Sequence, residues 1–200
     1  GVYLLMITTK NTLEVSTQND EQLMLSITNG NKRAFDVLYA RYEKRMFYFF
    51  FRKLNNNQEK AEDFWHDLFL KIIEKPEAFD TSKSFSPWFY SVAHNMVKNE
   101  YKKMEVRKIM DTETDTAHVV NHEIDPLHIT EEQLFKQRLF EELGKINQDS
   151  STAFIMKYHE GYSIEEIAET LNIKEGTVKS KLFYAKQVLL EKLGMFNPKN

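Results

Sequence analysis

Apolar side chains recur at intervals of three and four residues along most of this 200-residue chain, which is the spacing of helices that bury one face. From Asp20 the pattern predicts a short helix followed by a long one. A third helix follows the turn-forming residues 55–57 and ends before Pro76. A fourth begins near Pro87 and continues to about Met104. No segment reads as a strand, so the expected fold class is all-α.

The segment before Glu131 interrupts this pattern, because it contains five acidic residues between positions 111 and 130, no Lys or Arg, and Pro126. Helical spacing then returns and continues almost to the C-terminus. The pattern predicts two small helical domains joined by a flexible linker. The expected segments are an N-terminal tail (1–19), a first domain (20–108), an acidic linker (109–130) and a second domain (131–195).

Composition excludes several classes of protein. The absence of Cys excludes thiol nucleophiles and thiolate metal sites, and it favours a cytoplasmic protein. The longest apolar run near the N-terminus, residues 2–7, is far shorter than the ~20 residues that span a membrane, so no membrane insertion is expected. No Gly-rich phosphate loop or nucleophile motif is present, so we expect neither an enzyme nor a cofactor. The formal net charge of −3 means that any nucleic-acid binding must come from a local basic patch.

Three linker histidines, His118, His122 and His128, raise the question of a metal site. Glu123 and Asp125 lie nearby, and the spacing of the first two histidines suits one face of a helix. Metal ligands need a rigid frame, which a linker does not provide. No metal is therefore expected.

The second domain contains the pattern of a helix-turn-helix. Ser163 is followed three residues later by Glu166, which is the capping box that begins a helix. Asn172 falls where a tight turn between helices needs a left-handed backbone. Ile173 and Val178 then supply the apolar contacts that fix the two helices against each other.

The second helix of this motif is basic, whereas the helices before it are acidic. Residues 174–192 have a net charge of +3 and residues 131–169 a net charge of −5. Lysines on a terminal helix are usually only a solvated face. Here the charge separation coincides with the helix-turn-helix pattern, so we expect this helix to bind DNA. The residues expected to contact DNA are Lys174, Thr177, Lys179, Ser180, Lys181 and Phe183.

The first domain combines many aromatic residues with a basic segment. Most of its rings must form the core. However, Lys98, Lys102 and Lys103 follow closely after Trp88 and Asn95, in a stretch with a net charge of +3 over eleven residues. Aromatic rings beside basic groups are what single-strand binders use to stack on bases and hold the backbone. We therefore expect this segment to hold separated DNA strands.

Four segments in chain order resemble the sigma-70 superfamily of bacterial transcription initiation factors, and specifically the small extracytoplasmic function (ECF) sigma factors. They are AFDVLYARY (34–42), AEDFWHDLFLKI (61–72), FSPWFYSVAHNMVKNEYKK (85–103) and GYSIEEIAETLNIKEGTVKSKLFYAK (161–186). The resemblance covers about residues 20–193. It implies that the chain recruits core RNA polymerase, binds the minus-ten and minus-thirty-five elements of promoter DNA, and is inhibited by an anti-sigma factor.

The resemblance also implies roles for particular residues. Asp63, His66 and Asp67 lie in the segment similar to the polymerase-docking helix, although an acidic face of this kind is otherwise only solvated. Phe79 and Asn95 correspond to positions that form a pocket for a flipped base of the minus-ten element.

Trp88 matches a family tryptophan. From the residues alone, Phe79 and Trp88 would be assigned to the core, and Asn95 to the surface or a helix cap.

Two functions remain open at this stage. The first is a promoter-specificity subunit of RNA polymerase without catalysis of its own. The second is a helix-turn-helix regulator that binds duplex DNA, usually as a dimer, and whose first domain senses a ligand. The aromatic and basic segment of the first domain favours the sigma factor, because a duplex-binding regulator has no need to capture a single strand.

Overall fold

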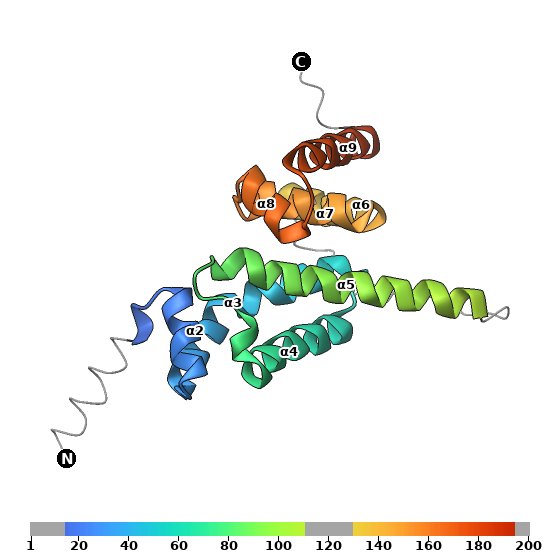
Figure 1. The fold of residues 1–200 in the computed structure, drawn as a ribbon. Helices are drawn as coiled ribbons and strands as arrows, with labels where there is room; N and C mark the ends of the chain where they lie inside the picture. The colour runs from blue at the N-terminus through green and yellow to red at the C-terminus, as the bar shows by residue number, and fades with distance from the viewer. Residues whose placement is uncertain (1–14, 111–129, 195–200) are drawn as a thin grey trace.

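The computed structural model describes residues 15–110 and 130–194 (Figure 1). These residues form helices and contain no strand, which confirms the all-α expectation. The N-terminal domain consists of α2 (Asp20–Thr28), α3 (Lys32–Lys53), α4 (Gln58–Glu74), the short 3-10 helix η1 (Pro76–Ala78) and α5 (Phe85–Met110). The C-terminal domain consists of α6 (Glu131–Lys145), α7 (Gln148–Phe154), the π-helical turn η3 (Ile155–His159), α8 (Ile164–Leu171) and α9 (Glu175–Leu193). Most of the predicted tail and linker, residues 1–14 and 111–129, lies outside the described residues.

Asparagine side chains fix the start of four helices. Asn19, Asn31, Asn57 and Asn147 each accept a hydrogen bond from a backbone N–H in the first turn of α2, α3, α4 and α7. Such caps satisfy donors that have no partner inside the helix. As the sequence predicts, α4 ends before Pro76, whereas α5 continues to Met110, beyond its expected end.

The core of the N-terminal domain is built from aromatic rings. The ring of Phe69 on α4 lies 5.0 Å from those of Tyr39 and Trp65 and 5.2 Å from that of Phe89 on α5. These contacts are tilted or edge-to-face, the arrangements that the ring quadrupole favours. They join α3, α4 and α5 into one packed unit and confirm that most of the rings belong to the core.

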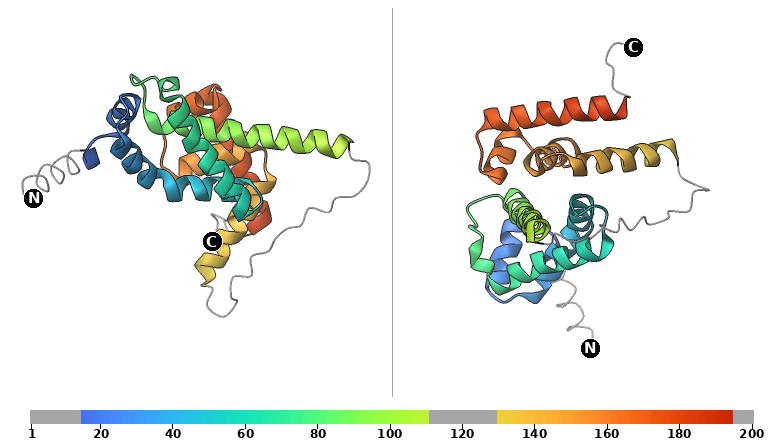
Figure 2. Two further views of the ribbon diagram at one scale, coloured as in Figure 1. Left: turned by 90° about the horizontal axis from the view of Figure 1, so that it is seen from below. Right: turned by 90° about the vertical axis from the view of Figure 1, so that its right-hand side faces the viewer.

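The two domains pack directly against each other, with α6, α7 and α8 facing α3 and α5 (Figure 2). The hydroxyl of Thr170 on α8 donates a hydrogen bond to the carbonyl of Pro87 at 3.3 Å. On the other side of the interface, the guanidinium of Arg52 lies 3.7 Å from the centre of the Phe140 ring. The sequence pattern did not predict this contact, because it involves residues far apart in the chain.

Candidate nucleic-acid interface

The turn between α8 and α9 has the expected helix-turn-helix geometry. The side chain of Ser163 accepts a hydrogen bond from the Glu166 backbone N–H at 3.1 Å, and Glu166 accepts one from the Ser163 N–H at 2.7 Å. Asn172 adopts the left-handed conformation, with φ 53° and ψ 50°, and α9 begins at Glu175. Val178 is fully buried and anchors α9 to the domain. The prediction of this motif is therefore confirmed.

The face of α9 that points away from the core carries most of the side chains predicted to contact DNA. Exposed residues on it are Lys174, Thr177, Lys179, Ser180 and Phe183. The Phe183 side chain is 64% exposed, and the next residue, Tyr184, is also exposed, so two consecutive aromatic rings face solvent. Lys181 differs from its neighbours, because its amine lies 3.4 Å from Asp149 Oδ2 and the side chain is only 22% exposed.

At the start of α5 the aromatic side chains belong to the core. Phe79 is 4% exposed, and its ring lies 5.0 Å from Trp88 and 5.4 Å from Phe85. Trp88 is half-buried. Its ring is therefore packed against Phe85 and Trp88, and a role of Phe79 in base binding stays a prediction.

Further along α5, the predicted strand-binding side chains share one face. Asn95, Lys98 and Lys102 are separated by three and four residues, which places them on the same side of the helix. Asn95, Lys102 and Lys103 are exposed. The amine of Lys98 lies 3.4 Å from Asp149 Oδ1, in the other domain.

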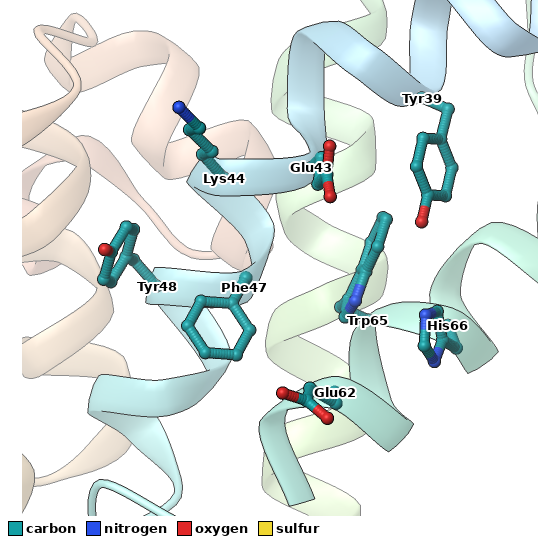
Figure 3. Close-up of a pocket in the computed structure, with 8 residues that line it drawn as sticks. All are labelled: Tyr39, Glu43, Lys44, Phe47, Tyr48, Glu62, Trp65 and His66. Atoms are coloured by element: carbon teal, nitrogen blue, oxygen red, sulfur yellow. The ribbon is translucent and has the colours of Figure 1, made fainter. Parts of the chain in front are cut away.

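The exposed face of α4 adjoins an aromatic pocket. Asp63, His66 and Asp67 are all exposed, and His66 lines a cavity of about 410 Å³ between α3 and α4 (Figure 3). The other lining residues are Tyr39, Glu43, Lys44, Phe47, Tyr48, Glu62 and Trp65. Sequence reasoning missed Glu43 and Glu62, although each is within one helical turn of a pocket ring and could have been found from that spacing.

Sequence reasoning also missed a buried polar cluster between the domains. Lys53 is 1% exposed, and burial lowers its pKa to about 7. His94 is 3% exposed, and burial followed by the nearby charge of Lys53 lowers its pKa to about 4. The neutral ring of His94 donates from Nε2 to Asp149 Oδ1 at 3.0 Å, and its Nδ1 accepts from the Thr152 hydroxyl at 2.9 Å. These residues come from α3, α5 and α7, so no local pattern could reveal the cluster.

The three linker histidines considered above lie outside the described residues. Within residues 15–110 and 130–194, no group of His, Asp and Glu side chains could hold a metal ion. No helix in the same ranges is long and apolar enough to cross a membrane.

Models of known families match both domains. Residues 38–106 match sigma-70 region 2, and residues 136–189 match sigma-70 region 4. The ECF RNA polymerase sigma-E factor of Haemophilus influenzae is 27% identical over 183 residues, which cover 87% of this chain and 95% of that protein. The ECF RNA polymerase sigma factor SigW of Bacillus subtilis is 25% identical over 174 residues, covering 84% and 92% of the two chains.

Solved structures share the fold. CnrH, in complex with the cytosolic domain of CnrY, matches with a TM-score of 0.65 and 20% identity over 89% of this chain and 99% of that one. The sigma factor RpoE of Bartonella quintana, in complex with the anti-sigma factor NepR, matches with a TM-score of 0.62 and 22% identity, covering 82% and 98%.

The fold and the exposed basic helices define a two-domain, helix-turn-helix transcription factor. With both family models matched in order and ECF factors as full-length relatives, the chain belongs to the sigma-70 family of RNA polymerase sigma factors and is of the ECF type.

Proposed function

We propose that this ECF sigma factor divides promoter recognition between two surfaces and binds core RNA polymerase with a third. The exposed face of α9 reads the minus-thirty-five element as duplex DNA. The face of α5 that contains Asn95 and Lys102 holds the separated strand of the minus-ten element. The exposed face of α4 docks on the polymerase, so that both DNA surfaces act within one complex.

One observation carries this proposal: each domain exposes its own basic helix. Lys174, the residue before α9, and Lys179 on α9 are exposed and suit phosphate or guanine, while the Phe183 ring suits a thymine methyl group. On α5, the Asn95 amide suits a base edge, and the adjacent lysines suit the phosphate backbone. A helix-turn-helix regulator of duplex DNA would account for α9 but would leave the exposed face of α5 without a role.

The exposed surface of α4 suits docking to the polymerase. Asp63 and Asp67 place two exposed carboxylates beside the pocket that His66 lines. An acidic face next to a pocket lined by aromatic rings suits a basic, partly apolar partner surface, such as the coiled coil of the largest polymerase subunit that the resemblance to the family implies. The role of the chain is to bind and position, without catalysis of its own.

An anti-sigma factor is a further proposed partner. CnrH and the Bartonella quintana RpoE were both solved with a bound protein, which for RpoE is the anti-sigma factor NepR. We propose that a protein of this kind also binds the present chain, and that the chain acts in the cytoplasm, where core polymerase and the chromosome are found.

Run-off transcription with core polymerase tests the proposal. Promoter-dependent product should form only when the protein is added. Asn95→Ala should leave closed-complex formation intact but reduce open complex, seen by permanganate footprinting, by the equivalent of about 1–3 kcal/mol, because it removes one base contact.

Asn99→Ala is the matched control, since Asn99 is an exposed asparagine one turn further along α5. Absence of promoter-dependent product from every candidate template would reject the sigma-factor function. Equal loss of open complex in both variants would reject the role of Asn95.

A further inference from the structure

The pocket that His66 lines combines aromatic walls with two acidic side chains. In Figure 3 the rings of Phe47 and Trp65 border one open space between α3 and α4. The carboxylates of Glu43 and Glu62 border the same space. The cavity volume of about 410 Å³ lies within the range of about 300–1,000 Å³ that is typical of small-ligand sites. The pocket therefore has room for a side chain or a small molecule.

The two carboxylates of the pocket are not neutralised. Within residues 15–110 and 130–194, no Lys or Arg side chain forms an ion pair with Glu43 or Glu62. Lys44 also lines the pocket, but its amine points away from both acids (Figure 3). Gln58 donates a hydrogen bond to Glu62 Oε1 at 2.8 Å, which orients the carboxylate and leaves its charge in place. The pocket thus offers two negative charges to a ligand.

The aromatic walls are fixed by packing in the core. Trp65 is only 4% exposed, and its ring lies 4.4 Å from that of Tyr39 and 5.0 Å from that of Phe69. The ring of Phe47 stacks on that of Phe51 at 5.8 Å. Because these rings are already held in place, a ligand would not have to order them, which lowers the entropic cost of binding.

This combination of groups suits a flat organic cation. A cation over a ring face is attracted by the ring quadrupole. A guanidinium group is planar and weakly hydrated, so it stacks on aromatic rings, and it donates parallel hydrogen bonds to a carboxylate. A metal ion fits less well, because rings supply no ligands and no group of His, Asp and Glu side chains in the described ranges could hold one.

The strength of such contacts indicates where the cation comes from. An exposed ion pair or cation–π contact changes affinity by only about two- to fivefold, so a free cation would bind weakly. A side chain on a protein already docked next to the pocket makes the same contacts without a separate cost of association. His66 belongs both to this pocket and to the exposed face of α4 with Asp63 and Asp67. The pocket is therefore continuous with the proposed docking face.

We propose that the pocket between α3 and α4 binds the guanidinium group of an arginine side chain, which core RNA polymerase inserts when it docks on α4. The rings of Phe47 and Trp65 contact the group, and the carboxylates of Glu43 and Glu62 accept its N–H donors. The proposal rests on the assignment of α4 as the polymerase-docking surface. It adds α3 to that surface and makes a single arginine the anchor of the contact.

Binding of the full-length protein to core polymerase tests the occupant. Glu43→Gln with Glu62→Gln keeps the size of both side chains and should weaken binding by about fivefold, because two partly exposed ion pairs lose their charge. Phe47→Leu keeps an apolar side chain without a ring face and should weaken binding by about threefold. Glu74→Gln with Glu77→Gln is the matched control, since it makes the same change at two exposed positions outside the pocket and should bind as the wild type.

NMR of the free protein tests the chemistry of the pocket. Methylguanidinium should shift the indole N–H signal of Trp65 and leave that of Trp88, which lies on α5, unchanged. Methylammonium at the same concentration and ionic strength should give a smaller shift, because its compact charge is strongly hydrated. The variant with Glu43→Gln and Glu62→Gln should lose the response to methylguanidinium. A purely structural role of the two acids would not distinguish between these cations.

Undiminished core binding by the variant with both pocket acids replaced, equal loss in the control, or equal NMR responses to the two cations would overturn the proposal. Selective methylguanidinium binding together with undiminished core binding would indicate a site for a free cation, and would overturn the polymerase as its source. If the wild type does not bind core polymerase, the sigma-factor function is rejected as well. A promoter-dependent transcript, with core binding undiminished when both acids are replaced, would reject the arginine pocket alone.

Discussion

Acidification should destabilise the folded protein through His94. The ring is enclosed by Lys53 from α3, Lys98 from its own helix and Asp149 from α7, and burial followed by the Lys53 charge lowers its pKa from 6.5 to about 4. A base with a lowered pKa in the folded state binds fewer protons there than in the unfolded chain. The contribution of His94 to the free energy of unfolding is therefore retained above pH 6.5 and is lost as the pH falls toward 4.

The size of the effect follows from the same pKa values. The drop in the pKa of His94 from 6.5 to about 4 corresponds to about 3 kcal/mol in the free energy of unfolding, since each pKa unit is worth about 1.4 kcal/mol. About 2 kcal/mol of this should be lost between pH 7 and pH 5. Burial lowers the pKa of Lys53 from 10.5 to about 7. Its protonation therefore changes the stability mainly between pH 7 and pH 10.5, above the interval from pH 7 to pH 5.

Urea unfolding at pH 7 and pH 5 measures the loss. His94→Gln keeps groups that can hydrogen-bond to Thr152 and Asp149 but does not titrate, so its stability should fall by about 2 kcal/mol less than that of the wild type. His66→Gln, at an exposed histidine, is the control and should behave as the wild type. Equal losses in the wild type and His94→Gln, or an NMR titration that places the pKa of His94 near 6.5, would refute the reasoning.

Three further predictions test the separate surfaces. Asn172→Ala should be about 1 kcal/mol less stable than Asn172→Gly in thermal unfolding, because the left-handed backbone at this turn penalises a β-carbon. Lys179→Ala should weaken binding to promoter duplex and reduce the slope of log K against log salt by about 0.9, if its amine contacts one phosphate. Asp63→Lys with Asp67→Lys should reduce pull-down of core polymerase without unfolding the protein, whereas Glu74→Lys, at the exposed C-terminal end of the same helix, should not.

Local patterns were sufficient to predict the helices and the helix-turn-helix. The Ser163 capping box, the left-handed Asn172 and the end of α4 before Pro76 all involve residues within a few positions of each other. Each reflects a backbone preference that the nearby sequence determines. The extension of α5 to Met110 was not predicted, although Val106, Ile109 and Met110 continue the three- and four-residue apolar spacing. These side chains are 52–79% exposed, so the last turns of α5 form without burying that face.

The resemblance did not predict that Phe79 is buried. An aromatic residue at a base-binding position can stack on a base or pack against a neighbouring ring, and the sequence pattern is the same in both cases. The difference lies in packing: Phe79 is enclosed by Phe85 and Trp88, which α5 brings to it.

The contacts of Asp149 could not be predicted for a related reason. In the sequence Asp149 is an acid in the first turn of a helix, where a negative charge is favoured whatever the tertiary structure. Lys98 and Lys181 belong to segments whose basic charge already had an explanation in DNA binding. The same lysine can suit a DNA phosphate and also contact Asp149 in this structure, and its sequence context does not distinguish the two. The positive charge that suits these helices to DNA is therefore also what allows one carboxylate to hold them together.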